Sequence, residues 1–154
     1  MSMEIRLLKR EDIPPAMALV WRVFSEFEAP EYSAEGVDTF RAFIEPEAIN
    51  RMKDAGELRL WGAFAGGELR GVLALRREAH ISLFFVEKEY HRQGIGRALW
   101  ECCAQACRAA GAERVTVNSS PYAVEIYRRL KFTETDAEQT QNGIRFVPME
   151  FSLF

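Results

Sequence analysis

A glycine-containing segment near the middle of the chain carries the clearest chemical signal in the sequence. It reads His91-Arg92-Gln93-Gly94-Ile95-Gly96-Arg97. Glycines let the main chain approach a ligand closely, and the first turn of a helix leaves amide N–H groups free to bind an anion. A pyrophosphate is the anion that such a turn favours, and Arg92 and Arg97 are candidate charge partners for it.

The elements on either side of this turn must be a buried strand and a helix. Residues 80–86 are short, apolar and rich in aromatic and β-branched side chains, which is typical of a buried strand. Apolar residues recur at helical spacing from Ile95 to Ala106, and Gly111 ends the pattern. No Lys-Ser or Lys-Thr pair follows the glycines, and Leu99 stands where a dinucleotide fingerprint needs a third glycine. A tight strand-to-helix turn without a ligand is the alternative interpretation.

Composition excludes several functional classes. The 154 residues are 48% apolar and 28% charged, which favours one globular domain over residues 1–154. The net charge of −3 argues against a general nucleic-acid binder. No apolar run has the length of a membrane span or a signal peptide, so we expect no membrane partner and a cytoplasmic location. Cys102, Cys103 and Cys107 lack the spacing of metal ligands, and no metal is expected.

The remaining segments predict a mixed α/β (α+β) fold with a central, mostly antiparallel sheet flanked by helices. Gly66-Gly67 separates two alternating runs and predicts a hairpin, and Ser120-Pro121 begins a helix. The expected strands are 4–8, 58–64, 69–75, 80–86, 114–118, 131–135 and 144–153, and the expected helices are 12–27, 33–44, 47–53, 95–110 and 120–130.

Two segments resemble motifs of the GNAT acyltransferase superfamily. Residues 91–96 resemble its acetyl-CoA-binding motif, Gln/Arg-x-x-Gly-x-Gly/Ala, with His91 where Gln or Arg is usual. Residues 118–132 resemble its late strand-helix segment, with Ser120 where Asn is commoner and Lys131 in place of a glycine. The element order matches the GNAT fold over nearly the whole chain. The resemblance implies direct transfer of an acetyl group from acetyl-CoA, as cosubstrate, to a primary amine.

The resemblance also assigns site residues. Tyr127 matches the tyrosine that faces the CoA sulfur and is the candidate acid, although core packing on its helix face is the alternative. His80 is the best-placed base, with Glu78 as runner-up, and Ser82 and Asn118 could orient the acceptor or water. The pantetheine arm is expected to follow the strand near Phe84 and Val86. The cosubstrate-binding residues implied are Phe84, Val86, Arg92, Gln93, Gly94, Ile95, Gly96, Arg97, Asn118 and Ser120.

Acidic and aromatic residues alternate between positions 26 and 35. The glutamates at 26, 28, 31 and 35 accompany Phe27 and Tyr32. Such a segment is either a solvated loop or the lip of a pocket that attracts a cationic amine. A small amine is the favoured acceptor, with a protein amine and a non-catalytic acyl-CoA-binding sensor as alternatives. A homodimer is compatible with the sequence.

Overall fold

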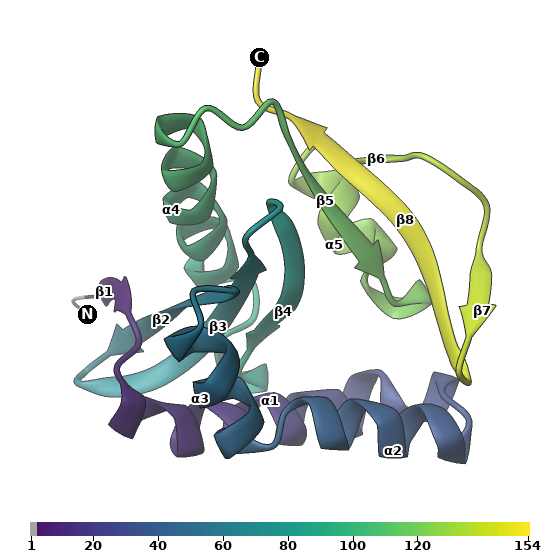
Figure 1. Ribbon diagram of the computed structural model, residues 1–154, viewed down its shortest axis with the longest axis horizontal. Helices are drawn as coiled ribbons and strands as arrows, with labels where there is room; N and C mark the ends of the chain where they lie inside the picture. Colours follow the sequence, from purple (N-terminus) through teal and green to yellow (C-terminus); the bar gives the residue numbers. More distant parts are fainter. Residues whose placement is uncertain (1–2) are drawn as a thin grey trace.

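A sheet with helices on both faces organises residues 3–154, the part of the chain that the computed structural model describes (Figure 1). The sheet order is β1-β2-β3-β4-β5-β8-β6, and β7 pairs with β8. The strands are β1 Met3–Leu7, β2 Leu58–Ala65, β3 Glu68–Arg76, β4 His80–Val86, β5 Arg114–Ser119, β6 Thr133–Glu134, β7 Gln139–Gln141 and β8 Ile144–Ser152. The helices are α1 Ile13–Phe27, α2 Ala34–Phe43, α3 Pro46–Asp54, α4 Ile95–Ala109 and α5 Val124–Arg129, with short 3-10 turns η1 Arg10–Asp12, η2 Ala29–Glu31, η3 Lys88–Tyr90 and η4 Pro121–Ala123.

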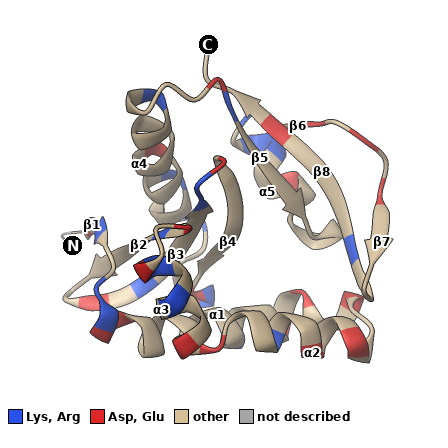
Figure 2. Cartoon of the chain, viewed as in Figure 1, with Lys and Arg blue, Asp and Glu red and all other residues tan. Residues whose placement is uncertain are grey.

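Two apolar clusters hold the layers together. Helices α1 to α3 cover one face of the sheet, where Phe24 and Val20 pack against Leu83 and Phe85 of β4. Helices α4 and α5 cover the other face, where Leu99 packs with residues of β2, β3 and β5. Because β4 contributes side chains to both clusters, its sequence is apolar over nearly its whole length. Figure 2 accordingly shows β4 without charged residues, whereas charges of both signs lie on the helices and turns.

The sheet divides between β4 and β5. This is the parallel pair of an otherwise antiparallel sheet, and its register covers only His80 opposite Thr116 and Ile81 opposite Val117. Beyond that point the two strands diverge toward α1 and α2 (Figure 1). The β3–β4 register shifts around Ser82, as in a β-bulge, which bends the strand at the start of the divergence. One edge of β4 is therefore free of a β5 partner from Ser82 onward.

The tip of the β7–β8 hairpin meets the start of α2. Ser33 caps α2 by accepting a hydrogen bond from the Gly36 amide, and its own amide donates to the Gly143 carbonyl at 3.3 Å. The Ser33 hydroxyl donates to the same carbonyl at 3.2 Å. A Cβ atom on Gly36 would lie only 2.4 Å from the Gly143 oxygen, so the helix and the hairpin tip are in direct main-chain contact.

The predicted fold class is confirmed, and the predicted elements follow one another in the predicted order, but the short strand β7 was not predicted. The Gly66-Gly67 hairpin forms as predicted, with both glycines at positive φ. Two segments differ in detail: the helix predicted over 120–130 begins as η4 before α5, and the strand predicted over 131–135 is reduced to β6. Ser120 nevertheless caps this start, because its hydroxyl oxygen accepts a hydrogen bond from the Ala123 amide at 3.2 Å.

Candidate functional site

A cavity of about 930 Å³ occupies the space between the diverging strands. Its walls come from the end of α1 and from α2, from β4, from the turn before α4, and from the end of β5 with η4 and α5. This volume is at the upper end of small-molecule sites, large enough for an extended ligand and a second reactant. The predicted site residues that line it are His80, Phe84, Val86, Arg92, Gly94, Gly96, Arg97, Asn118, Ser120 and Tyr127.

The glycine turn at the start of α4 has the geometry of an anion-binding cradle, the name used for it below. Gly94 has φ +85° and lies at the N-cap, a conformation that disfavours residues with a side chain. The first bond of the helix runs from the Ala98 amide to the Gly94 carbonyl, 3.0 Å, which leaves the amides of residues 95–97 outside the helical ladder. No acidic residue lies in that first turn, and exposed Arg92 and Arg97 border the cavity.

Two predicted members of the cradle contribute main chain rather than side chain. The Ile95 side chain is buried beneath the turn. The Gln93 side-chain amide donates to the Glu89 carbonyl at 2.9 Å, which turns it back along the chain. Both residues are still part of the turn. Any contact that they make with a ligand must therefore come from their main-chain amides and not from their side chains.

His91, the departure from the usual motif, holds the turn against β4. Its Nε2 atom lies 2.7 Å from the Val86 carbonyl, and its ring lies 5.3 Å from the ring of Phe27 between centroids. The Val86 carbonyl is thus already engaged by protein. The edge of β4 between Ser82 and Val86 has no β5 partner and is the main-chain edge left for a ligand to pair with. The Ser82 hydroxyl, buried on this strand and bordering the cavity, finds no hydrogen-bond partner among the described residues.

Tyr127 belongs to both the core and the cavity wall. Its ring packs edge-on against Phe84, 6.0 Å between centroids, and against Phe132 at 5.3 Å. Burial raises the pKa of the phenol, and the charges of Glu28 and Cys103 raise it further. The phenol therefore remains protonated across the neutral range. Core packing and proton donation do not exclude each other here, because the ring packs while the residue borders the cavity.

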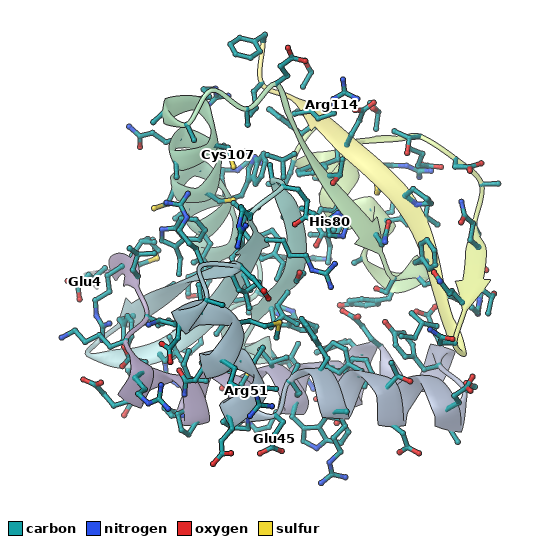
Figure 3. All side chains as sticks on the ribbon, in the orientation of Figure 1. Glu4, Glu45, Arg51, His80, Cys107 and Arg114 are labelled. Carbon is teal, nitrogen blue, oxygen red and sulfur yellow. The ribbon has the colours of Figure 1, made fainter. Side chains whose placement is uncertain are left out.

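His80 lies where β4 and β5 meet, at the closed end of the division (Figure 3). Its Nδ1 atom is 2.8 Å from the Thr116 hydroxyl. Burial, with the nearby Arg76 charge, lowers the pKa of its imidazole, so the ring is neutral at pH 7. Phe84, which contacts Tyr127, is four residues further along β4, roughly 13 Å at about 3.3 Å per residue. Glu78, the predicted runner-up, is exposed in the β3–β4 turn.

The four glutamates of residues 26–35 do not share one environment and do not together form the rim of the cavity. Glu26 forms an ion pair with Lys88 at 3.0 Å, and Glu31 accepts a hydrogen bond from the Tyr122 amide at 3.0 Å. Glu28 is the glutamate of this segment that lines the cavity. Burial raises the pKa of its carboxyl to about 7; the Ser120 hydroxyl opposes the shift by hydrogen bonding, and the Glu31 charge adds to it.

Sequence reasoning grouped Glu28 with its three neighbours and gave it no role of its own. Nothing local separates it from them. Its partners Ser120 and Tyr127 lie more than 90 residues later in the chain, so a tertiary contact alone distinguishes it. The sole sequence signal is its place directly after an amphipathic helix, followed by Pro30, and this signal is weak.

The wall on the α1–α2 side is aromatic. Tyr32, Phe40, Phe43 and Phe85 border the cavity there. Phe24 supports them from behind, stacked on Phe40 with centroids 4.0 Å apart. This half of the cavity therefore combines an apolar aromatic surface with one carboxylate from residues 26–35, that of Glu28. Such a combination suits an amine that carries an apolar group.

Residues 3–154 contain no group of three or more His, Cys, Asp or Glu side chains arranged to hold a metal ion. Cys103 and Cys107 are buried, and Figure 3 places Cys107 on α4 beside the sheet. None of the helices in this part of the chain combines the length and apolar character that crossing a bilayer requires.

Comparison with known proteins places this geometry in a family. A family model described as an acetyltransferase (GNAT) domain matches residues 28–153. A GCN5-related N-acetyltransferase from Rhodopseudomonas palustris superposes with a TM-score of 0.82 at 21% identity, covering 99% of this chain and 98% of the other. The PaiA N-acetyltransferase of Thermoplasma acidophilum, solved in complex with coenzyme A, gives 0.80 at 22% identity and 99% of each chain.

A more distant structure is the ribosomal-protein-S18-alanine N-acetyltransferase of Escherichia coli, with a TM-score of 0.66, 18% identity, and coverage of 99% of this chain and 94% of the other. A search of curated protein sequences finds no significant match. At these identities the solved structures establish the fold alone, and the family model carries the assignment over most of the chain. The chain belongs to the GNAT acetyltransferase family.

Proposed function

We propose that this protein is an acetyl-CoA-dependent N-acetyltransferase whose acceptor is a small primary amine with an apolar body. The observation that carries the proposal is one continuous cavity that joins the glycine cradle to the aromatic wall, with Tyr127 between them. The cradle suits a pyrophosphate, and the aromatic wall suits the acceptor. The cytoplasm, where acetyl-CoA is available and the three free thiols stay reduced, is the proposed compartment.

The cosubstrate would be held mainly by main-chain groups. The amides of residues 95–97 point the positive end of the α4 dipole at the pyrophosphate, with Arg92 and Arg97 as charge partners. The pantetheine arm would pair with the free edge of β4 near Phe84, as an added strand does. A related structure that contains coenzyme A supports this assignment of the cavity.

Transfer requires a neutral amine next to the thioester carbonyl carbon. The amine nitrogen attacks that carbon, the carbon–sulfur bond breaks, and the sulfur takes the proton of the Tyr127 phenol. The proton that the nitrogen then sheds restores the phenol. The raised pKa of Tyr127 suits this role, because the phenol is protonated before each transfer.

The hairpin tip favours a small acceptor. The contacts of Ser33 and Gly36 with Gly143 close the space between α2 and β8 and leave less room there for an extended polypeptide. A small amine or the free end of a chain can still enter. The N-terminal amine of a protein is the second candidate, because one structural relative is named as an acetyltransferase of the S18 alanine.

An acceptor panel tests the proposal. The protein is incubated with acetyl-CoA and, separately, phenethylamine, spermidine, a peptide with a free N-terminus, and an N-acetylated peptide with one lysine. Free thiol release and the product mass are recorded. We expect acetylated phenethylamine at the highest kcat/KM and weak use of spermidine, whose several charges find too few unpaired acids. Tight acetyl-CoA binding without an acetylated product from any amine would overturn the enzyme and favour an acyl-CoA sensor.

A further inference from the structure

We propose that Glu28 binds the ammonium group of the acceptor and takes its proton, an inference that rests on the acetyltransferase function proposed above. His80, the base predicted from the sequence, lies elsewhere in the cavity. Three features support this role: Glu28 lines the cavity, it has no ion-pair partner among residues 3–154, and Tyr127, a proton donor, lines the same cavity.

Position is the first observation. Glu28 is the C-cap residue of α1, is half-buried, and lines the cavity. Residues on both sides of Glu28 contact η4: the Phe27 ring stacks on the Tyr122 ring, 5.3 Å between centroids, and Glu31 accepts a hydrogen bond from the Tyr122 amide at 3.0 Å. The Ser120 hydroxyl, fixed by the Ala123 amide at the start of η4, acts on the Glu28 carboxyl and opposes the rise in its pKa. Glu28 and Tyr127 line the same cavity, and the Glu28 charge contributes to the raised pKa of the Tyr127 phenol. Tyr127 packs on Phe84, beside the free edge of β4 where the thioester would lie.

The absence of a counterion is the second observation. Glu26 is paired with Lys88, and Glu87 is paired with Arg22. Among the ion pairs formed by residues 3–154, none includes Glu28. A carboxylate held in a mostly apolar cavity without a cation gains a partner when an alkylammonium group enters. The ligand that satisfies this site is therefore the protonated form of the acceptor.

The electrostatic surroundings suit proton transfer. Burial raises the pKa of Glu28 to about 7, so the group can alternate between its two protonation states near neutrality. Glu31 and Tyr32 flank it on its own segment, and Tyr122 and Tyr127 face it from η4 and α5. The charge of Arg92, which also borders the cavity, opposes the rise in the pKa of Tyr122. Burial raises the pKa of Tyr127 as well, which separates a proton acceptor from a proton donor within one cavity.

The proton balance closes. The ammonium gives one proton to the Glu28 carboxylate, and the freed lone pair attacks the thioester carbonyl carbon. The carbon–sulfur bond breaks, and the thiolate takes the Tyr127 proton. The remaining extra proton on nitrogen passes to the phenolate, and the Glu28 carboxyl releases its proton to water when the product leaves. One ammonium and one acetyl-CoA give one acetamide, one free CoA thiol and one proton.

His80 is the alternative base, and it lies in a different part of the cavity from Glu28. Its Nδ1 atom is committed to the Thr116 hydroxyl at the closed end of the division. It lies four residues before Phe84 on β4, whereas the segment of Glu28 packs against η4, which leads directly into the helix of Tyr127. Variants of the two residues therefore separate the two assignments.

The test compares Glu28→Gln with Glu28→Asp, His80→Ala and the surface control Glu26→Gln. Steady-state kinetics with phenethylamine are measured from pH 6 to 9.5, and acetyl-CoA affinity is measured by calorimetry. We expect Glu28→Gln to lower kcat/KM by about 10²–10⁴-fold and to remove the rise in rate near pH 7. Glu28→Asp should restore part of kcat/KM and part of its rise near pH 7. The kcat/KM of Glu26→Gln should equal that of wild type, and so should the acetyl-CoA affinity of the Glu28 and Glu26 variants.

A second acceptor isolates the proton step. Trifluoroethylamine is already neutral at pH 7, so it needs no base before attack, and Glu28→Gln should acetylate it at a rate within a few-fold of wild type. An unchanged pH profile and rate in Glu28→Gln with phenethylamine would overturn the assignment, as would loss of the pH limb in His80→Ala alone. If the wild-type protein acetylates neither amine nor any other acceptor of the panel, the proposed function itself fails.

Discussion

The two halves of the cavity are built in different ways. The half proposed for the cosubstrate, called the cosubstrate half below, comes from one uninterrupted stretch, β4, the glycine turn and the start of α4, and it offers mainly main-chain groups. The acceptor half is assembled from α1–α2, from η4 and α5, and from the β7–β8 tip, and it offers side chains. Its closing hydrogen bond, from Ser33 to Gly143, joins residues 110 positions apart.

This contrast has a chemical reason. A pyrophosphate is the same in every acyl-CoA, so one turn with fixed backbone geometry can serve any acceptor. The acceptor varies, and side chains on separate segments can change without disturbing that turn. The cosubstrate half should therefore respond to backbone changes, and the acceptor half to side-chain and contact changes, with little effect of one on the other.

The largest effect is expected from Gly96→Val. A Cβ on Gly96 would lie 3.7 Å from the Phe84 ring, an ordinary contact, so the fold should survive. The added methyl groups would occupy the space beside the α4 amides, and CoA binding should be lost in calorimetry. Gln105→Val, on the exposed face of the same helix, is the control and should bind normally. Gly94 is a poorer target, because its φ of +85° strains any substituted residue. Normal CoA affinity in a folded Gly96→Val protein would remove the cradle from the site.

Tyr127→Phe should have the next largest effect. The change removes the hydroxyl and keeps the ring between Phe84 and Phe132, so CoA affinity and unfolding should change little. Turnover should fall by about 10²–10⁴-fold, as is typical when a positioned proton donor is lost. Reduced stability with normal turnover per folded molecule would make Tyr127 a core residue alone.

Glu28→Gln should increase stability at alkaline pH. A carboxyl whose pKa is raised in the folded state, here from 4.5 to about 7, stabilises the fold below pH 4.5 and loses that contribution as pH rises through 7. The amide cannot ionise, so at pH 8 the variant should unfold with a free energy higher by up to about 3 kcal/mol. Urea unfolding at pH 4 and pH 8 measures the difference, which should vanish at pH 4. If Glu28→Gln and wild type had the same free energy of unfolding at pH 8 as well as at pH 4, the Glu28 carboxylate would be well solvated in the folded protein.

The sequence predicted the cosubstrate half better than the acceptor half. Residues 80–97 were predicted with their elements and their anion chemistry, because strand pattern, positive-φ glycine and helix start are local properties. His91 contacting Val86 was not, since a side chain that replaces the usual motif residue can take any nearby partner. Tyr127 was found through a family motif, and its edge contacts and raised pKa agree with a proton donor.

The acceptor half shows the opposite case. The sequence identified an acidic-aromatic segment but treated its four glutamates alike. An ion pair with Lys88 and a hydrogen bond from the Tyr122 amide engage two of them, and burial against Ser120 distinguishes Glu28. Each of those partners belongs to another element. No spacing rule within residues 26–35 encodes them, because the contacts exist only after the sheet has brought α1 and α5 to one cavity.

Gly36→Ala should give the smallest effect and separates the two halves most cleanly. Its Cβ would lie 2.4 Å from the Gly143 oxygen, so the hairpin tip must move away from α2. The gain in helix propensity, up to about 1 kcal/mol, offsets part of the lost contact. We therefore expect a modest change in stability and a rise in the KM of a small amine of roughly fivefold, equivalent to about 1 kcal/mol. Better use of the lysine peptide should accompany it, because the space between α2 and β8 opens.

The cosubstrate half lies across the sheet division from this contact, so acetyl-CoA affinity in Gly36→Ala should equal that of wild type. Asp38→Ala, on the exposed face of the same helix, controls for the added alanine and should change neither parameter. Ser33→Ala removes the hydroxyl bond to Gly143 without adding bulk and should shift KM in the same direction by less. If Gly36→Ala weakened acetyl-CoA and the amine equally, the two halves would be energetically coupled through the hairpin, and the independence argued from their construction would be wrong.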